Sequence, residues 1–244
     1  MPEMFVDLHI HSCLSPCGDA DMTPGNILGM AALKGLDAVA IADHNSALNL
    51  PAAQEIAGAY GVLLVPAMEI TTREEVHLLG YFPDVRSAMA CGEMLRAHLP
   101  KRKNKPALFG EQLILDADDR VIGAEEALLI GATDLSLTEC AHLVRGYGGV
   151  PVPAHINRGA NGLLMNLGFM PETPAFSAVE VWRALPCAPE PLEGRHILHS
   201  SDAHYLGDIL EREFALHPPE RSVRGLLHWM DAERKNYKKH QQMR

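Results

Sequence analysis

The chain has 244 residues, 47% of them hydrophobic, and its 31 acidic and 21 basic side chains give a formal net charge of −10. This composition is that of an ordinary globular protein with a sizeable core, and the length fits one large domain. The negative charge disfavours long duplex nucleic acid as a partner, although a local positive site could still hold one phosphate.

Seven short apolar runs, rich in valine, leucine or isoleucine, are typical of buried parallel strands. They cover residues 5–10, 37–43, 62–68, 76–82, 150–156, 178–182 and 196–201. Segments with helix-capping signals lie between several of them, at 24–35, 51–61 and 136–149. This alternation predicts right-handed βαβ units and an α/β fold.

The stretch 87–134 interrupts the alternation. Its first part has the pattern of a helix that ends before Pro100, and 112–123 predicts a hairpin with two apolar strands around an Asp-Ala-Asp-Asp turn. We expect 87–134 to be an insertion or lid within a single domain that spans 1–244. A last helix is predicted over 223–235.

The cellular setting follows from cysteine usage and from the apolar runs. Five irregularly spaced cysteines, an odd number, argue against a disulfide framework. The apolar runs are all shorter than the roughly 20 residues that span a bilayer, and the first residues lack the pattern of a secretory signal. We therefore expect a cytoplasmic protein without a membrane partner.

Histidines and acids stand at the ends of the strand-like runs. His9 and His11 end the first run, and Asp202 and His204 follow the last one. Because a strand alternates its side chains with a period of two, the members of each pair project the same way. Imidazole and carboxylate groups suit zinc, manganese or iron(II). Together with Glu69, these pairs predict a metal centre assembled from distant segments.

Three more histidines, His44, His77 and His155, lie within or directly after apolar runs, where an unpaired imidazole would be costly to bury. A lone histidine is more often structural than a ligand. That interpretation holds for His98, His142, His217, His228 and His240. His44, His77 and His155 differ because other ligand types accompany them at strand ends.

In these residues the chain resembles the polymerase and histidinol phosphatase (PHP) family of metal-dependent phosphoesterases. The family's motifs occur in order, as Asp7-x-His9-x-His11, Ala42-Asp43-His44, Glu69 with His77, His155, and Asp202-x-His204. Alanine at 42 replaces the family's usual threonine. The resemblance implies a distorted (β/α)7 barrel, which agrees with the number of apolar runs, and 87–134 would be a lid-like segment inserted in it.

The resemblance also implies two or three divalent ions (Zn, Mn or Fe). The first ion would have His9, His11, Glu69 and Asp202 as ligands, the second Glu69, His77 and His155, and the third His44, His204 and one residue of the loop after His11. Counting back from Thr23 favours Asp19 as that loop ligand, and counting forward from His9 favours Cys17. We assign Asp19, and Asp21 is a third possibility or a helix-capping residue.

Such a cluster suits phosphate esters, because the cations would outweigh the ligand carboxylates and leave a positive pocket. A hydroxide between two metals would attack phosphorus without a protein nucleophile. Arg158 is the candidate to grip a substrate phosphate. Asp43 and His199 are candidate proton shuttles or orienting groups for ligand imidazoles. The substrate would be a small-molecule phosphate, a nucleotide or a short oligonucleotide.

Two other functions stay open. Barrels with His-x-His metal sites also hydrolyse amide or ring C–N bonds, but many of them bridge their metals with a carboxylated lysine where this chain has Glu69. A metal-holding regulatory module is the non-enzymatic alternative, and the intact ligand set argues against it. The choice between monoester and diester, and the oligomeric state, do not follow from the sequence.

Overall fold

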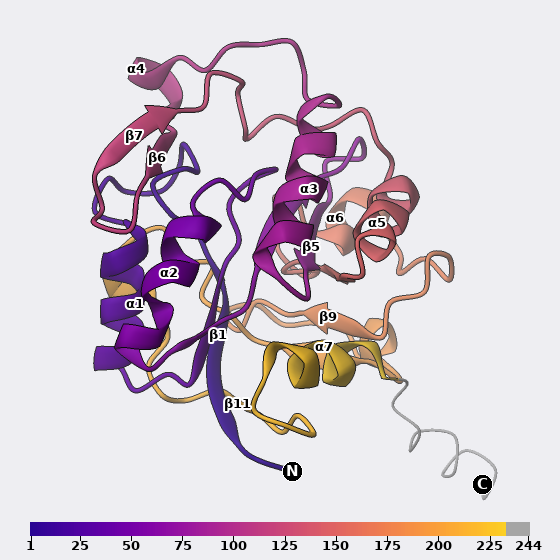
Figure 1. Cartoon of the computed structure of the whole chain (residues 1–244). Coiled ribbons are helices and arrows are strands. Elements are labelled where there is room, and N and C mark those ends of the chain that lie inside the picture. The colour runs from indigo at the N-terminus through magenta and orange to yellow at the C-terminus, as the bar shows by residue number, and fades with distance from the viewer. Residues whose placement is uncertain (233–244) are drawn as a thin grey trace, which may run out of the picture.

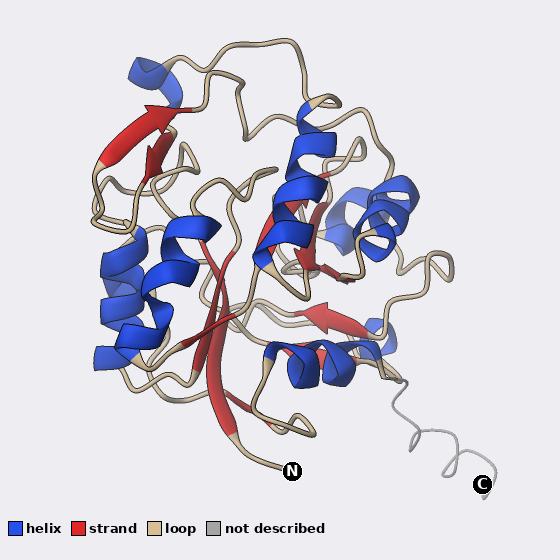
Figure 2. Ribbon diagram, viewed as in Figure 1, coloured by secondary structure: helices blue, strands red, loops and turns tan. Residues whose placement is uncertain are grey.

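The strands of the computed structural model, which describes residues 1–232, form several ladders with helices packed around them (Figures 1 and 2). The first ladder has the order β11-β1-β2-β3, with bounds Met4–Ile10 (β1), Ala38–Ile41 (β2), Leu63–Leu64 (β3) and Ala215–Leu216 (β11). β1, β2 and β3 are parallel as predicted, and β11 pairs antiparallel with β1. α1 (Pro24–Leu33) and α2 (Leu50–Tyr60) cover this ladder.

The predicted strand 62–68 is divided at Pro66, which has no N–H to donate to a ladder. β3 ends before it, and β4 (Ala67–Thr71) begins a second ladder with the order β4-β5-β8, in which β5 is His77–Tyr81 and β8 is Val150–Pro153. Both pairings are antiparallel. The prediction of parallel strands is therefore wrong for β5, because a short turn and not a helix joins it to β4.

The remaining predicted strands form a parallel pair, β9 (Ala178–Glu180) with β10 (His196–Leu198). Isolated bridges connect separate ladders at one end of the strands. They join Ile10 to Ala203 and His44 to Glu69, so motif-bearing segments lie side by side there. The other helical elements here are α5 (Leu137–Gly146), α6 (Leu163–Leu167), and the 3₁₀ turns η1 (Glu190–Leu192) and η2 (Leu206–Asp208).

Alternate strand residues belong to two buried apolar clusters, which explains why the strands read as continuous apolar runs. One cluster, with Val39 and Leu78, packs against α1, α2, α3 and α5. The other, with Val6 and Leu79, lies among the strands and includes Met230 of α7 (Val223–Asp231). The last helix begins where it was predicted, and residues 233–235 of that prediction lie outside the described part.

The segment 87–134 contains two different kinds of structure. α3 (Val85–Arg96) buries Cys91 and Leu95 in the main core. Beyond it, α4 (Pro106–Phe109) and the strands β6 (Leu113–Leu115) and β7 (Val121–Ala124) stand apart from the other ladders (Figure 1). β6 and β7 pair antiparallel, which confirms the predicted hairpin. Among the described helices, none combines the length and apolar character needed to cross a membrane.

Candidate metal centre

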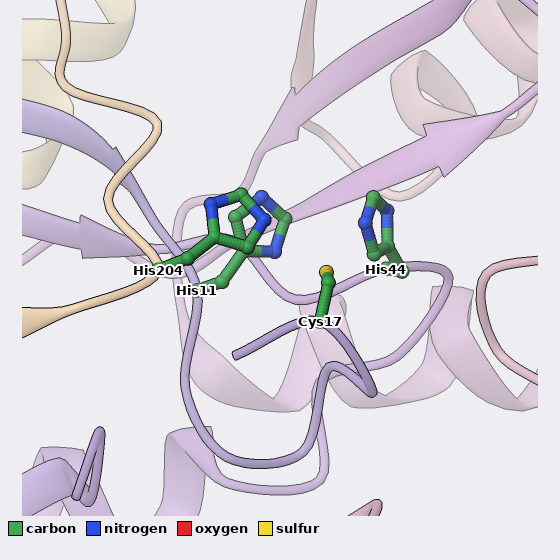
Figure 3. Close-up of side chains that lie close together, drawn as sticks. All are labelled: His11, Cys17, His44 and His204. Atoms are coloured by element: carbon green, nitrogen blue, oxygen red, sulfur yellow. The ribbon is translucent and has the colours of Figure 1, made fainter. Parts of the chain in front are cut away.

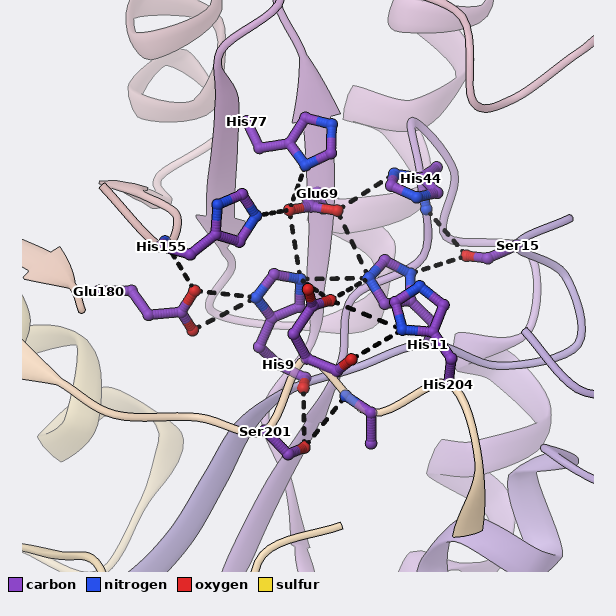
Figure 4. Close-up of polar contacts among 12 residues, drawn as sticks. His9, His11, Ser15, His44, Glu69, His77, His155, Glu180, Ser201 and His204 are labelled. Atoms are coloured by element: carbon purple, nitrogen blue, oxygen red, sulfur yellow. Dashed lines mark hydrogen bonds and ion pairs between the residues drawn. The ribbon is translucent and has the colours of Figure 1, made fainter. Parts of the chain in front are cut away.

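Four predicted ligands from three separate segments converge on one point, and Figure 4 labels three of them, His9, His11 and Glu69. His9 and His11 come from the end of β1, Glu69 from β4, and Asp202 from the loop after β10. The Nε2 of His9 lies 3.3 Å from Glu69 Oε1 and 3.4 Å from Asp202 Oδ1, and the Nε2 of His11 lies 3.0 Å from Asp202 Oδ1. One ligand atom from each of the four residues lies within 4.8 Å of the ligand atoms of the other three. This set of two imidazoles and two carboxylates fits a divalent cation.

The Glu69 carboxylate is also the meeting point of three further imidazoles. His77 Nδ1 and His155 Nε2 lie 2.8 and 3.2 Å from Oε1, and His44 Nδ1 lies 3.1 Å from Oε2. His77 reaches this point because β5 runs opposite to its neighbours, so that its first residue lies where other strands end. Glu69 therefore has the position of a carboxylate that bridges two cations.

Several buried ring nitrogens in this cluster lack a normal partner. The Nδ1 atoms of His44, His77 and His155 make no hydrogen bond of acceptable geometry, although the first two are close to Glu69. Burial lowers the pKa of His77 to about 4 despite the nearby carboxylate, so its ring is neutral at physiological pH. Neutral imidazole is the form that coordinates a metal. The residues present thus fit the divalent ions that the sequence predicts.

A third group consists of His11, Cys17, His44 and His204 (Figure 3). The sulfur of Cys17 lies between the His44 ring and the stacked rings of His11 and His204, whose centroids are 4.4 Å apart. Burial raises the pKa of the Cys17 thiol, but hydrogen bonds with His204 and His44 outweigh it and lower the pKa to about 5. The structure thus brings the alternative loop residue, Cys17, to the predicted third site.

Asp19, the loop ligand assigned from the sequence, has a different role in the structure. Its carboxylate accepts a hydrogen bond from the backbone N–H of Asp21 at 2.9 Å, and its own N–H donates to the His204 carbonyl at 2.9 Å. Among the described residues, Asp19 is outside the groups that could share an ion. Cys17, and not Asp19, is therefore the loop residue that the structure groups with imidazoles, because the Asp19 carboxylate is directed to the loop backbone.

Glu180 is a buried contact of two predicted ligands that the sequence prediction missed. This carboxylate in β9 is only 2% exposed and lies 3.1 and 3.2 Å from His9 Nδ1. It also accepts the backbone N–H of His155 at 2.9 Å. Burial lowers the pKa of His9, yet Glu180, Glu69 and Asp202 hold it well above its ordinary value. The same negative field favours a cation. The sequence offered one signal for Glu180, which is that an acidic residue stands inside the apolar run 178–182.

Asp43 acts on the cluster through a hydroxyl group. Its carboxylate accepts hydrogen bonds from the Ser12 N–H at 2.7 Å and from the hydroxyls of Ser12 and Ser15 at 2.6 and 2.7 Å. The Ser15 Oγ lies 3.0 Å from His11 Nδ1. Asp43 therefore fixes the loop and, through Ser15, the orientation of the His11 ring. Of the two roles predicted for Asp43, these contacts fit that of a group that orients a ligand imidazole.

His199 does not join the cluster. Its Nδ1 donates to the Val181 carbonyl at 2.8 Å, and its ring packs edge-on against Phe214 with centroids 5.3 Å apart. These contacts satisfy the imidazole structurally. The role of proton shuttle expected for His199 therefore has no geometric support in the described residues.

Arg158 lies at the rim of the centre. Its guanidinium forms an ion pair with Asp202 and lies 4.9 Å from the centroid of the Trp182 ring. The side chain is 40% exposed, so it remains available to a ligand. A cation held beside the cluster in this way is suited to an anionic substrate.

Two adjoining cavities give access to the centre. The smaller, of about 220 Å³, is lined by residues of all three groups together with Ile130, Arg158 and Asn161. The larger, of about 730 Å³, shares Cys17, Arg158, Asp202 and His204 with it. Its wall adds Trp182, Arg183 and Tyr205. A ligand in the larger cavity would meet guanidinium and aromatic groups beside the metal ligands.

The backbone is in an uncommon conformation at two predicted ligands. His155 has a φ of +27° and Asp202 a φ of +50°, values that residues other than glycine rarely adopt. Conformations of this kind cost about 1–3 kcal/mol each and concentrate at functional sites. The hydrogen bond from His155 N–H to Glu180 helps to hold the first of them.

Comparisons with known proteins find phosphodiesterase and exoribonuclease relatives. The chain is 28% identical over 159 residues to phosphoribosyl 1,2-cyclic phosphate 1,2-diphosphodiesterase from Eggerthella lenta, a match that covers 62% of this chain and 57% of that protein. It is 30% identical over 112 residues to the 5'-3' exoribonuclease Rnm from Salmonella typhimurium, over 44% of this chain and 37% of Rnm. The chain therefore spans about half or less of the length of these relatives. No protein-family model matches the chain.

Solved structures define the fold. The lesion-specific endonuclease EndoQ from Pyrococcus furiosus superimposes with a TM-score of 0.68 at 18% identity, over 94% of this chain and 56% of EndoQ. A two-domain protein from Bacteroides vulgatus, described as containing a predicted PHP-like metal-dependent phosphoesterase, gives a TM-score of 0.54 at 17% identity, over 94% of this chain and 63% of that one. The chain has the PHP-like phosphoesterase fold. The α/β class and the PHP resemblance predicted from the sequence are thereby confirmed.

Proposed function

We propose that this chain is a PHP-type phosphoesterase that hydrolyses a phosphodiester of small-molecule or nucleotide size. The convergence of His9, His11, Glu69 and Asp202 on one point, with His77 and His155 on the other side of Glu69, carries the proposal. Two or three divalent ions of zinc, manganese or iron bound there would supply a hydroxide nucleophile and neutralise charge on the phosphate. Both curated relatives are named for reactions at phosphodiester bonds.

The chain's own residues prepare the site for such a substrate. Glu180 accepts a hydrogen bond from the Nδ1–H of His9, which leaves Nε2 facing Glu69 and Asp202. Arg158 would bind a non-bridging phosphate oxygen at the cavity rim. Trp182 provides a flat apolar surface in the same cavity for the organic part of the ester.

Two finer features of the fold belong to this proposal. We propose that the ladders form one distorted (β/α)7 barrel, because bridges at Ile10–Ala203 and His44–Glu69 and the bond from Ile156 N–H to the Glu180 carbonyl join successive ladders. We also propose that 87–134 is a lid-like insertion within a single domain of residues 1–244, since its residue Ile130 lines the small cavity. The five free cysteines support the proposed cytoplasmic location.

Hydrolysis of bis(p-nitrophenyl) phosphate and p-nitrophenyl phosphate tests the function. Purified protein loaded with manganese or zinc should release p-nitrophenol, with the diester preferred, and a chelator should abolish the release. His9→Ala should remove activity, and Arg158→Ala should raise KM roughly tenfold with a smaller effect on kcat. Activity that survives both chelation and His9→Ala would refute the proposal. Hydrolysis of amide substrates alone would favour the C–N hydrolase alternative.

A further inference from the structure

Cys17 is placed as a ligand and not as a core cysteine. Its sulfur forms a group with His11, His44 and His204 in which one ligand atom from each lies within 4.8 Å of the others (Figure 3). His44 is 4% exposed, so its ring belongs to the buried side of this group. Cys17 also lines both cavities of the site. By contrast, Cys91 is buried in the apolar core.

The loop that carries Cys17 is held by close backbone contacts. A Cβ atom at Gly18 would lie 2.4 Å from the Ser12 carbonyl oxygen, so only glycine fits this turn. On the other side, Gly110 has a φ of +98°, and a Cβ there would lie 2.0 Å from the Pro16 carbonyl oxygen. The residues before and after Cys17 are therefore fixed by the loop itself and by the segment that leads into β6. This rigidity preorganises the thiol toward the imidazoles of His44 and His204.

We propose that Cys17 is a thiolate ligand of the third metal site and makes that site select zinc over manganese. The inference rests on the metal centre of the proposed function. Thiolate is a soft ligand that favours zinc, and one sulfur with the imidazole nitrogens of His44 and His204 gives three protein ligands, the number found in zinc sites that keep one open position. On binding, the Sγ–H bond breaks, its proton goes to solvent, and the sulfur lone pair forms the bond to the ion. The groups around Glu69 contain only nitrogen and oxygen, which manganese also accepts.

Cobalt(II) spectroscopy and thiol alkylation test the assignment without measuring turnover. Wild-type apoprotein titrated with cobalt(II) should develop a near-ultraviolet thiolate-to-cobalt charge-transfer band. Cys17→Ser should lack the band, and the half-buried Cys187→Ser should keep it as the matched control. Iodoacetamide followed by peptide mass spectrometry should modify Cys17 in apoprotein and in manganese-loaded protein. Zinc should slow this modification roughly tenfold or more.

Cys17→Asp gives an independent check on selectivity. In this variant the third site should bind manganese about as tightly as the first two sites do, and it should lose its preference for zinc. The proposal is overturned if wild-type protein binds cobalt fully without the band, if Cys17→Ser retains it, or if zinc and manganese protect Cys17 equally. A protein with the band but without phosphodiesterase activity would refute only the proposed function. Diesterase activity in a protein without the band would refute only the thiolate ligand.

Discussion

Glu180 offers the sharpest test of how the metal centre is held, because it touches two predicted ligands and is no member of the ligand groups itself. In Glu180→Ala, the His9 Nδ1–H and the His155 backbone N–H both lose their buried acceptor. In Glu180→Gln, the amide oxygen still accepts from one of these donors, but the negative charge is lost. The two variants therefore separate the loss of charge from the loss of both hydrogen bonds.

The expected size follows from these contacts. Loss of a group that orients a metal-bound histidine weakens metal affinity or activity by about 10–100-fold, which corresponds to about 1.4–2.7 kcal/mol. Glu180→Gln keeps one bond and the side-chain shape, so we expect a loss near the tenfold end. Glu180→Ala leaves two donors unsatisfied at a position only 2% exposed, so we expect a loss near the hundredfold end.

Metal affinity is measured by competition with a chromophoric chelator, and kcat/KM with the diester substrate under saturating metal. Glu193→Ala, a change at an exposed surface acid, is the control and should match wild type. Circular dichroism of the apoproteins checks that the variants are folded. If folded Glu180→Ala binds metal as tightly as wild type and the Glu193 control, the orienting role of Glu180 is wrong.

Three further outcomes are expected. Chelation should lower the Tm by roughly 5–10 °C, since metal at about 100 times its Kd adds about 2.7 kcal/mol; an unchanged Tm in calorimetry would show that the cluster binds no structural ion. Ser15→Ala should weaken metal binding about tenfold in the same competition assay, because it breaks the link between Asp43 and His11, and unaltered affinity would exclude that link. Burial raises the pKa of Glu125, but the hydrogen bonds and charge of Arg96 outweigh burial and hold this pKa below its usual 4.5. Arg96→Ala should therefore cost about 1 kcal/mol at pH 7 by denaturant unfolding, and the difference should disappear as the pH falls below about 4.5 through the folded-state pKa; a difference that persists at pH 3 would contradict this ion pair.

The sequence predicted those features that depend on local periodicity. A period of two was sufficient to place His9 beside His11, and it needed no knowledge of the loops. The orientation of β5 could not be predicted in the same way, because its apolar run looks like those of the parallel strands. The difference lies in the length of the connection that precedes it, which is too short for a helical crossover.

Contacts between distant segments account for the other differences. The choice between Cys17 and Asp19 depends on a turn fixed partly by Gly110, far along the chain. Glu180 acts on His9 from 171 positions away, so no spacing in the sequence connects them. His199 follows the same apolar pattern as the ligands, and only the three-dimensional structure shows that its ring turns to the Val181 carbonyl.

The turn between β4 and β5 determines which side chain the reversed strand delivers to the cations. Thr71 is paired with His77 across the hairpin, and successive residues of a strand face opposite sides. Deleting one residue from 72–76 while the turn keeps its length would draw His77 into the turn and would present Leu78 where the imidazole now stands. Loop length, as well as residue identity, therefore determines the chemistry of this centre, and a homologue with a shorter turn would need its histidine elsewhere.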